Sequence, residues 1–306
     1  VSSSGRLTLP VQMLLAFIAG AAYPLAFAPF HLWPLTFASA AVLFWLLSRA
    51  EGRMPLIAWV FGLGKYAVGV SWIYVSIHQY GGASPLLAGI MVAVFVAFMA
   101  LFCLPIGWFL GELEASKQNI SKSVLAMGFV ATWVLMEWML TWFLTGFPWL
   151  FAGHAMLGTP LQGYAPIVGN LGISLVVLTI TVAVMLSVDK AQPWKMRLAM
   201  AGVAVVLAGL GVSLDGQVWT KPTGRYEAAL VQGNIDQAIK WDADQRLNNV
   251  RKHMQLSEDH WDTDILIWPE FALTLYGQDA VAVTDLLNRR GESSQPNVVI
   301  GMPDVQ

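Results

Sequence analysis

The sequence predicts an α-helical membrane domain with several spans, residues 1–214, followed by a smaller α/β domain, residues 215–306. Hydrophobic residues make up 57% of the 306 residues and charged residues 12%, against roughly a quarter charged in ordinary soluble domains. The charges are also unevenly distributed: residues 1–214 contain 9 Lys+Arg and 5 Asp+Glu, whereas residues 215–306 contain 8 and 14. A net charge of -2 argues against a nucleic-acid partner, which requires a basic surface.

The membrane domain is expected to contain about seven transmembrane helices, because seven apolar segments approach the roughly 20 residues that cross a bilayer. These segments are Leu9–Phe30, Trp33–Ser48, Pro55–Ile77, Pro85–Leu110, Val124–Phe143, Pro166–Val188 and Met196–Leu214. The first contains Ala26-Phe27-Ala28, which resembles a signal-peptide cleavage site, but its apolar run is longer than a typical signal core. We therefore expect it to be a retained anchor.

Lys and Arg residues in the connections predict the orientation of these spans. They occur before the first span and in every second connection, at Arg6, Arg49, Arg53, Lys117, Lys122, Lys190, Lys195 and Arg197. The three other connections contain no Lys or Arg. Because positively charged loops remain in the cytoplasm, the residues after the seventh span are expected outside, which in a Gram-negative bacterium is the periplasm.

The second domain alternates short apolar runs with helical patterns. Strands are expected at 228–231, 265–268 and 298–300, and helices at 242–260 and 280–290, with Gly291 as the residue that ends the second helix. This order predicts parallel strands joined by crossover helices. In such sheets ligands bind at the carboxyl ends of the strands.

Glu270 is the leading catalytic candidate, because it follows the apolar run Ile265–Trp268 and Pro269 at the carboxyl end of a predicted strand. Burial against Trp268 and Pro269 would raise its pKa and make it a stronger general base near neutral pH. The alternative is a carboxylate that caps a helix or pairs with a cation.

Three aromatic residues are candidates for binding a lipid. Trp241 follows a strand-to-loop transition at Val231–Ile235 and is expected either to hold an acyl chain or to pack in the core. Phe147 and Trp149 belong to a long uncharged connection, 144–165, at an expected membrane interface. Aromatic residues there commonly form an interfacial belt; the alternative is that this connection lines a lipid groove.

Two charged residues and the single cysteine fall inside predicted spans. Charges within a span mark functional sites by default. A transporter would use such groups as well, so Lys65 and Glu137 are the main support for that rival class. Cys103 is expected to be a small packing residue rather than a reactive thiol.

Four motifs resemble the apolipoprotein N-acyltransferase family of bacterial inner-membrane enzymes. They are Trp72–Ile77 with Tyr80-Gly-Gly82, Leu144–Leu150, Val231–Ile235 with Lys240-Trp241, and Ile267-Trp-Pro-Glu270. Their order, and their spacing relative to the spans, make the resemblance specific over essentially the whole chain. It implies an eight-span membrane domain joined to a periplasmic domain of the nitrilase type, an α-β-β-α sandwich of which residues 215–306 would be the first part.

The resemblance also implies a Glu–Lys–Cys triad whose glutamate falls on Glu270, and it places Trp241 on a functionally important tryptophan near the active site. The family motif usually continues with Ser or Thr, where this chain has Phe271, so a hydroxyl beside the base is missing. The family's lysine, nucleophilic cysteine and last span are expected beyond Gln306, because Cys103 lies in a span. The chain is accordingly expected to be an inactive fragment of an active enzyme.

The implied reaction is the last step of lipoprotein maturation. An acyl chain passes from a phosphatidylethanolamine-like phospholipid to a cysteine thioester, and then to the N-terminal diacylglyceryl-cysteine of an apolipoprotein. No cofactor or metal is expected. Rival functions are a polytopic transporter or lipid-binding membrane protein, a membrane-anchored nitrilase-type amidase, and a degenerate homologue that only binds lipoproteins.

Overall fold

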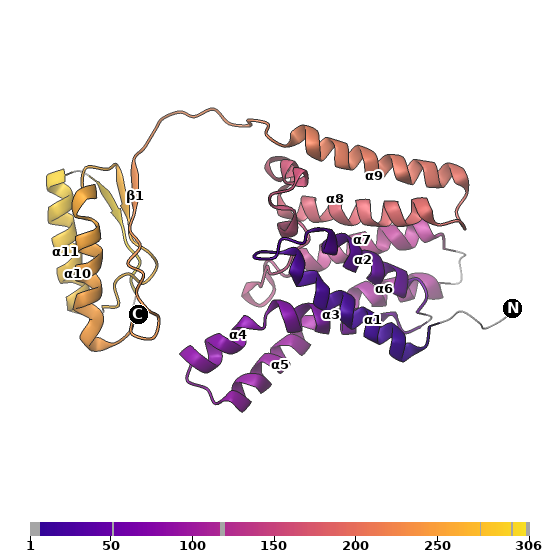
Figure 1. Cartoon of the computed structure of the whole chain (residues 1–306), viewed down its shortest axis with the longest axis horizontal. Helices are drawn as coiled ribbons and strands as arrows, with labels where there is room; N and C mark the ends of the chain where they lie inside the picture. Colours follow the sequence, from indigo (N-terminus) through magenta and orange to yellow (C-terminus); the bar gives the residue numbers. More distant parts are fainter. Residues whose placement is uncertain (1–6, 51, 117–119, 276, 295, 304–306) are drawn as a thin grey trace. The chain divides into compact units, whose positions relative to one another are not determined.

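The computed structural model describes residues 7–50, 52–116, 120–275, 277–294 and 296–303. The chain forms two compact units, Val1–Trp219 and Thr220–Gln306, whose elements are labelled in Figure 1. Arg6 and Lys117, two of the cations that predict the orientation, lie outside the described residues.

The first unit is helical. Its longer helices are α1 (Leu9–Ala22), α2 (Pro34–Leu47), α3 (Met54–Gly69), α5 (Pro85–Leu101), α6 (Leu104–Ala115), α7 (Lys122–Met139), α8 (Ala165–Val188) and α9 (Trp194–Leu214). Shorter helical turns are η1 (Tyr23–Ala26), α4 (Trp72–Val75), η2 (Ser76–Tyr80), η3 (Phe143–Thr145), η4 (His154–Met156) and η5 (Pro160–Tyr164). Proline occupies the first turn of six of these longer helices. Backbone N–H groups in the first turn have no partner within the helix, so proline loses no hydrogen bond there, and its fixed φ favours the helix.

Four helical stretches in the described residues are long and apolar enough to cross a membrane: Leu9–Ala26, Pro85–Ala115, Pro160–Val188 and Trp194–Leu214. They coincide with the first, fourth, sixth and seventh predicted spans. The third predicted span is a pair of helices, Met54–Gly69 and Trp72–Tyr80, bent by 51°. Of the other two, α2 has only 14 residues and α7 includes both Lys122 and Glu137. A total of about seven crossings therefore stays a prediction.

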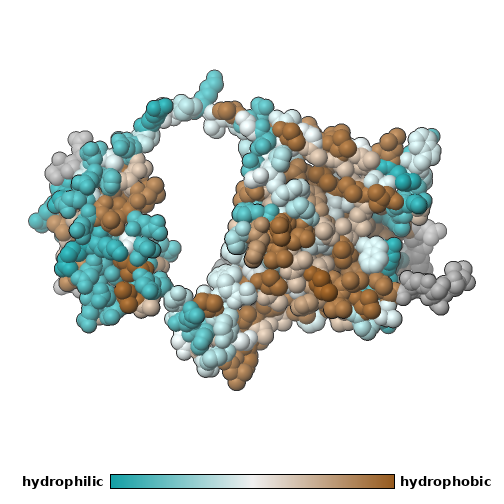
Figure 2. All heavy atoms as spheres, viewed as in Figure 1, coloured by the Kyte–Doolittle hydropathy of each residue, from teal (hydrophilic) through white to brown (hydrophobic). Residues whose placement is uncertain are grey.

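The outer surface of this unit is rich in apolar side chains, as the brown areas in Figure 2 show. Large aliphatic residues on five of its helices are exposed: Leu14, Leu56, Leu86, Val94, Leu175, Val184, Leu198 and Val205. Exposed apolar surface on this scale marks contact with a membrane or another protein. Together with the long apolar helices, it indicates a membrane protein.

Helices α1 and α3 pack with their backbones in contact. A Cβ atom at Gly20 of α1 would collide with the carbonyl oxygen of Phe61, and one at Gly64 of α3 would collide with the carbonyl oxygen of Phe17. Small residues allow this close approach. Helices in a membrane depend on such packing, because lipid tails are as apolar as the side chains and the hydrophobic effect does not drive the helices together. Gly20 and Gly64 therefore set the distance between the two helices.

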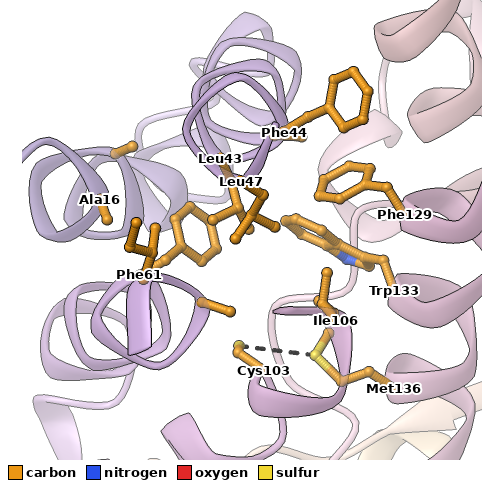
Figure 3. Close-up of a cluster of buried hydrophobic side chains, with 14 of the residues drawn as sticks. Ala16, Leu43, Phe44, Leu47, Phe61, Cys103, Ile106, Phe129, Trp133 and Met136 are labelled. Carbon is orange, nitrogen blue, oxygen red and sulfur yellow. Dashed lines mark hydrogen bonds between the residues drawn. The ribbon is translucent and has the colours of Figure 1, made fainter. Parts of the chain in front are cut away.

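Aromatic side chains fill the centre of this unit (Figure 3). Trp133 of α7 lies 5.5 Å from Phe129 and 5.7 Å from Phe61, and Phe129 lies 5.3 Å from Phe44 of α2, measured between ring centroids. Cys103 is buried at the edge of the same cluster, with its Sγ 3.9 Å from the sulfur of Met136. This is the environment expected of a packing residue.

The second unit is a small α/β layer. Its strands β1 (Ala228–Leu230), β2 (Ile265–Ile267) and β3 (Asn297–Val299) form a parallel sheet in the order β1-β2-β3. Helix α10 (Arg246–Leu256) connects the first two strands and α11 (Gly277–Ser294) the last two. The predicted parallel sheet with crossover helices is confirmed. The predicted helix end at Gly291 is wrong: α11 runs on to Ser294 and stops just before Pro296, which lacks the N–H that a helix interior needs.

One face of this sheet is covered and the other is open. Both crossovers step in the same direction across the sheet, so their right-handedness places α10 and α11 on one side, as Figure 1 shows. Leu266, at the middle of β2, is buried beneath them, whereas Leu230 and Val299 are 78% and 49% exposed. The sheet therefore presents apolar side chains on the face that the helices leave free.

Candidate functional site

The carboxyl ends of β1 and β2 in the second unit enclose a hollow of about 220 Å³. Strand β1 runs into Val231-Gln-Gly-Asn234, and the central strand β2 runs into Trp268-Pro-Glu270. The residues that line the hollow are Gln232, Gly233, Asn234, Ile235, Lys240, Asn249, His253, Pro269, Phe271 and Ala272. This is the sheet edge at which the topology predicts a ligand.

Glu270 lies at the rim of this hollow, between the lining residues Pro269 and Phe271, and its side chain is exposed. The predicted burial of its carboxylate against Trp268 and Pro269 is therefore wrong for this unit. Strand β2 ends at Ile267, and Phe271 has a φ of 51°, so the backbone has left the sheet before it reaches Glu270. The indole of Trp268 turns inward instead, and its Nε1–H donates to Ser257 Oγ at 2.9 Å.

The structure brings Trp241 and the Glu270 segment together. Lys240 Nζ donates to the backbone oxygen of Glu270 at 3.2 Å, and the Trp241 ring lies 5.6 Å from that of Phe271. Asn249 of α10 fixes the backbone beside Trp241, because its Nδ2 donates to the Lys240 carbonyl at 3.2 Å. Trp241 is 40% exposed, so it is a rim residue rather than part of the core. Its role in binding a lipid stays a prediction.

His253 of α10 also lines the hollow and is not among the residues predicted from the sequence. It is 2% exposed and its ring lies 5.2 Å from that of Trp268. Its Nδ1–H donates to the Asn249 carbonyl at 2.8 Å, which leaves Nε2 as an acceptor without a partner in the described part of the chain. The available signal was its place beside Val250 on the apolar face of a helix that follows a strand.

Burial lowers the pKa of His253, and the positive charges of Lys240 and Lys252 lower it further, while the hydrogen bond to Asn249 acts in the opposite direction. The unfolded chain, with an ordinary histidine pKa of about 6.5, therefore takes up this proton at a higher pH than the folded chain. The folded second unit is thus expected to lose stability as the pH falls below about 6.5, by up to about 1.4 kcal/mol per pH unit.

Urea unfolding of this unit, measured between about pH 7 and about pH 5, checks that dependence. His253→Phe, which removes the buried imidazole, should flatten it. An equally steep fall with pH in His253→Phe would assign the titration to another group.

A second hollow lies within the first unit and is predominantly apolar. We call this hollow of about 560 Å³ the groove; its lining residues are Pro24, Leu25, Phe27, Ala28, Pro29, Phe30, Val68, Gly69, Ser71, Trp72, Pro148, Trp149, Leu150, His154 and Leu157. Trp149 is fixed there by a hydrogen bond from its Nε1–H to the Gly69 carbonyl at 3.0 Å and by the Trp72 ring at 5.6 Å. Phe147 packs behind Trp149, with ring centroids 6.0 Å apart. Of the two predicted lipid-binding residues, Trp149 lines the groove and Phe147 supports it.

Gly69 is the point at which α3 touches the wall of the groove. A Cβ atom there would collide with Leu150 Cδ1, so Gly69→Ala is expected to push the Leu150 side chain aside and reshape the groove. A loss of about 1 kcal/mol in lipid affinity, roughly a fivefold rise in Kd, is the expected result in a binding assay with fluorescent phospholipid. Gly89→Ala on α5, where a Cβ has open space, is the matched control. Equal affinities for both variants would contradict this role of Gly69.

A unit of long apolar helices joined to a small parallel α/β unit defines a membrane-bound α/β protein. A sequence profile of the apolipoprotein N-acyltransferase N-terminal domain matches residues 19–184. Proteins named apolipoprotein N-acyltransferase from Pseudomonas putida, Coxiella burnetii and Vibrio cholerae are 38%, 35% and 33% identical to the chain over 294, 301 and 302 residues. The chain belongs to the apolipoprotein N-acyltransferase family.

These alignments cover 95%, 96% and 98% of the chain, but 57%, 60% and 58% of the three relatives. The chain therefore spans somewhat more than half the length of the curated relatives that it matches. The matched profile falls on the first unit, where it includes the groove residues Val68–Trp72 and Pro148–Leu157.

Proposed function

We propose that the protein expressed from its complete reading frame transfers an acyl chain from a phospholipid to the N-terminal diacylglyceryl-cysteine of apolipoproteins. The observation that carries this proposal is the meeting of Glu270 and Trp241 at the carboxyl end of the central strand, in a chain of this family. The groove in the first unit adds an apolar site of a size suited to part of an acyl chain.

The second unit is proposed to be part of a nitrilase-like domain, an α-β-β-α sandwich. Its two helices cover one face of the sheet, while Leu230 and Val299 on the other face are exposed. A second sheet packed on this face would bury those side chains, and sheets in sandwiches pack in this way at about 10 Å. The open face therefore supports the sandwich.

The chemistry is proposed to run in two half-reactions through a cysteine thioester. Glu270 accepts the proton of a cysteine thiol, and the thiolate attacks the sn-1 ester of a phosphatidylethanolamine-like donor. The ester C–O bond breaks as the thioester forms, and the lysophospholipid leaves with the proton from Glu270. The α-amine of the diacylglyceryl-cysteine then attacks the thioester; Glu270 takes the amine proton and returns it to the sulfur as the C–S bond breaks, which leaves the amide and the free thiol. A covalent intermediate divides one difficult transfer into two easier steps.

Neither the nucleophile nor the lysine of this reaction is assigned within the 306 residues. Cys103 is buried in the aromatic cluster of the first unit, where no ester can reach it. An oxyanion formed at the ester carbon would be stabilised by a preorganised cation, and we place the family's lysine in that role. The 306-residue chain by itself is therefore expected to be inactive.

The site is proposed to face the periplasm from the inner membrane. The cations between the spans support this orientation, because Lys190 and Arg49 then lie in the cytoplasm and Glu270 lies outside. Both substrates are held in the membrane by acyl chains, so a site directly above the outer leaflet meets their reacting groups.

The test is reconstitution of the complete protein in vesicles that contain phosphatidylethanolamine and a diacylglyceryl-cysteine peptide. We expect the mass of the peptide to rise by one acyl chain and an equal amount of lysophospholipid to form. Hydrolysis of small amides without acyl transfer would favour the amidase. Transport of lipid across the vesicle without a change in peptide mass would favour the transporter.

A further inference from the structure

The first unit encloses two charged side chains that the proposed chemistry does not use. Lys65 on α3 and Glu137 on α7 are both fully buried, and an isolated charge in a membrane interior is costly. Both contact the side chain of Trp133: Lys65 Nζ lies 5.6 Å from its ring centre, and the indole Nε1–H donates to Glu137 Oε1 at 3.0 Å. Neither lines the groove, so their function has to be sought in what they hold.

Lys65 lies in a cage of aromatic rings. Its Nζ is 4.8 Å from the ring centre of Tyr23, 5.4 Å from that of Tyr66 and 5.6 Å from that of Trp133. It has no hydrogen-bond partner within the described part of the chain. The ammonium is therefore stabilised by the faces of these rings.

Glu137 holds a backbone segment through one of its two carboxylate oxygens. Its Oε1 accepts hydrogen bonds from Trp133 Nε1 at 3.0 Å and from the backbone N–H of Ala152 at 2.8 Å. The next N–H along the chain, that of Gly153, donates to Ser174 Oγ of α8 at 2.8 Å. Two successive backbone amides between α7 and α8 are thus fixed by buried side chains of those helices.

These two amides stand in the middle of one wall of the groove. Trp149 and Leu150 precede them and His154 and Leu157 follow them, and all four residues line the groove. The position of that wall therefore depends on the hydrogen bond between Ala152 and Glu137.

We propose that Glu137 is a positioning residue for the groove, that Lys65 is its buried counter-charge, and that Trp133 links the two. The groove so held takes an acyl chain of a membrane lipid, which rests on the proposed function. A carboxylate binds a backbone N–H more strongly than a neutral acceptor does, but it is tolerated here only with a cation beside it. Removing one partner of a buried pair leaves the other charge uncompensated, whereas replacing both is often tolerated.

The test compares Glu137→Gln, Lys65→Met and the double variant in the complete protein, reconstituted with a range of phospholipid concentrations. Each single variant is expected to raise KM for the phospholipid about tenfold, the effect of roughly 1.4 kcal/mol, with a smaller change in kcat. The double variant keeps an oxygen acceptor without an unpaired charge and should recover to within about threefold of wild type. Glu112→Gln, at an exposed position on α6, should change neither constant.

Amide hydrogen exchange gives a readout that needs no activity. Glu137→Leu, which removes the acceptor, should speed exchange in peptides that span residues 150–157, whereas the Glu137→Gln and Lys65→Met double variant should exchange as wild type does. Unchanged exchange in Glu137→Leu, or additive losses in the double variant, would overturn the proposal. If the variants exchange as expected but the wild-type protein shows no acyl transfer, the proposed function is refuted, and the role of Glu137 in holding the groove wall is still supported.

Discussion

Replacing Glu270 with Gln in the complete protein is expected to lower acyl transfer by about 10²–10⁴-fold, the usual contribution of a general acid–base group. Glutamine has nearly the same shape but cannot accept the thiol proton. The Glu270 side chain is exposed, and Lys240 binds the backbone oxygen of this residue rather than its carboxylate. The fold should therefore survive the substitution, and the loss should appear in kcat.

The measurement is the rate of thioester formation from labelled phospholipid, with the thermal unfolding midpoint recorded beside it. Asp262→Asn supplies the matched control, because Asp262 is an exposed acid of the same unit outside the hollow. A normal rate of thioester formation in Glu270→Gln would remove this residue from the mechanism.

Gly64→Val is expected to destabilise the first unit by about 3 kcal/mol or more, because overpacking that moves a backbone exceeds the 1–3 kcal/mol usual for an extra side chain in a core. Even the first carbon of the new side chain would meet the carbonyl oxygen of Phe17, and it would lie 2.9 Å from the backbone nitrogen of Ala21. Neither atom can rotate away, so α1 has to separate from α3. The yield of folded protein in detergent and its unfolding midpoint should both fall.

Gly209→Ala on α9 is the control, because a Cβ there meets open space and alanine favours a helix by up to about 1 kcal/mol over glycine. It should match or exceed wild type in stability. If Gly64→Val were as stable as Gly209→Ala, this result would contradict a close backbone contact between α1 and α3.

Local patterns predicted the strands of the second unit more closely than its helices: the helix expected at 242–260 is the shorter α10, Arg246–Leu256. The runs at 228–231, 265–268 and 298–300 became β1, β2 and β3 within one or two residues, because short apolar runs between turns have few alternatives. The predicted end of α11 at Gly291 was wrong, because glycine permits a helix to end but does not force it to do so.

The candidate site was predicted less completely. Glu270 and Trp241 were selected from motifs, and the loop from Lys240 and the turn at Phe271 do bring them together. The burial of Glu270 was wrong, because burial depends on which distant segments pack on a residue and not on its neighbours in sequence. The groove could not be predicted from the sequence for the same reason. Its lining comes from three separate segments, 24–30, 68–72 and 148–157, which share no local pattern.

The proposed reaction requires the second unit to lie on the outer side of the membrane. In the 306-residue chain Cys103 is the only cysteine and is buried, so one cysteine introduced at the exposed Asp262 can be labelled selectively. A membrane-impermeant maleimide should label Asp262→Cys in cells whose outer membrane alone has been opened, and should label Lys190→Cys only after lysis. Labelling of Asp262→Cys only after lysis would place Glu270 in the cytoplasm and contradict the account.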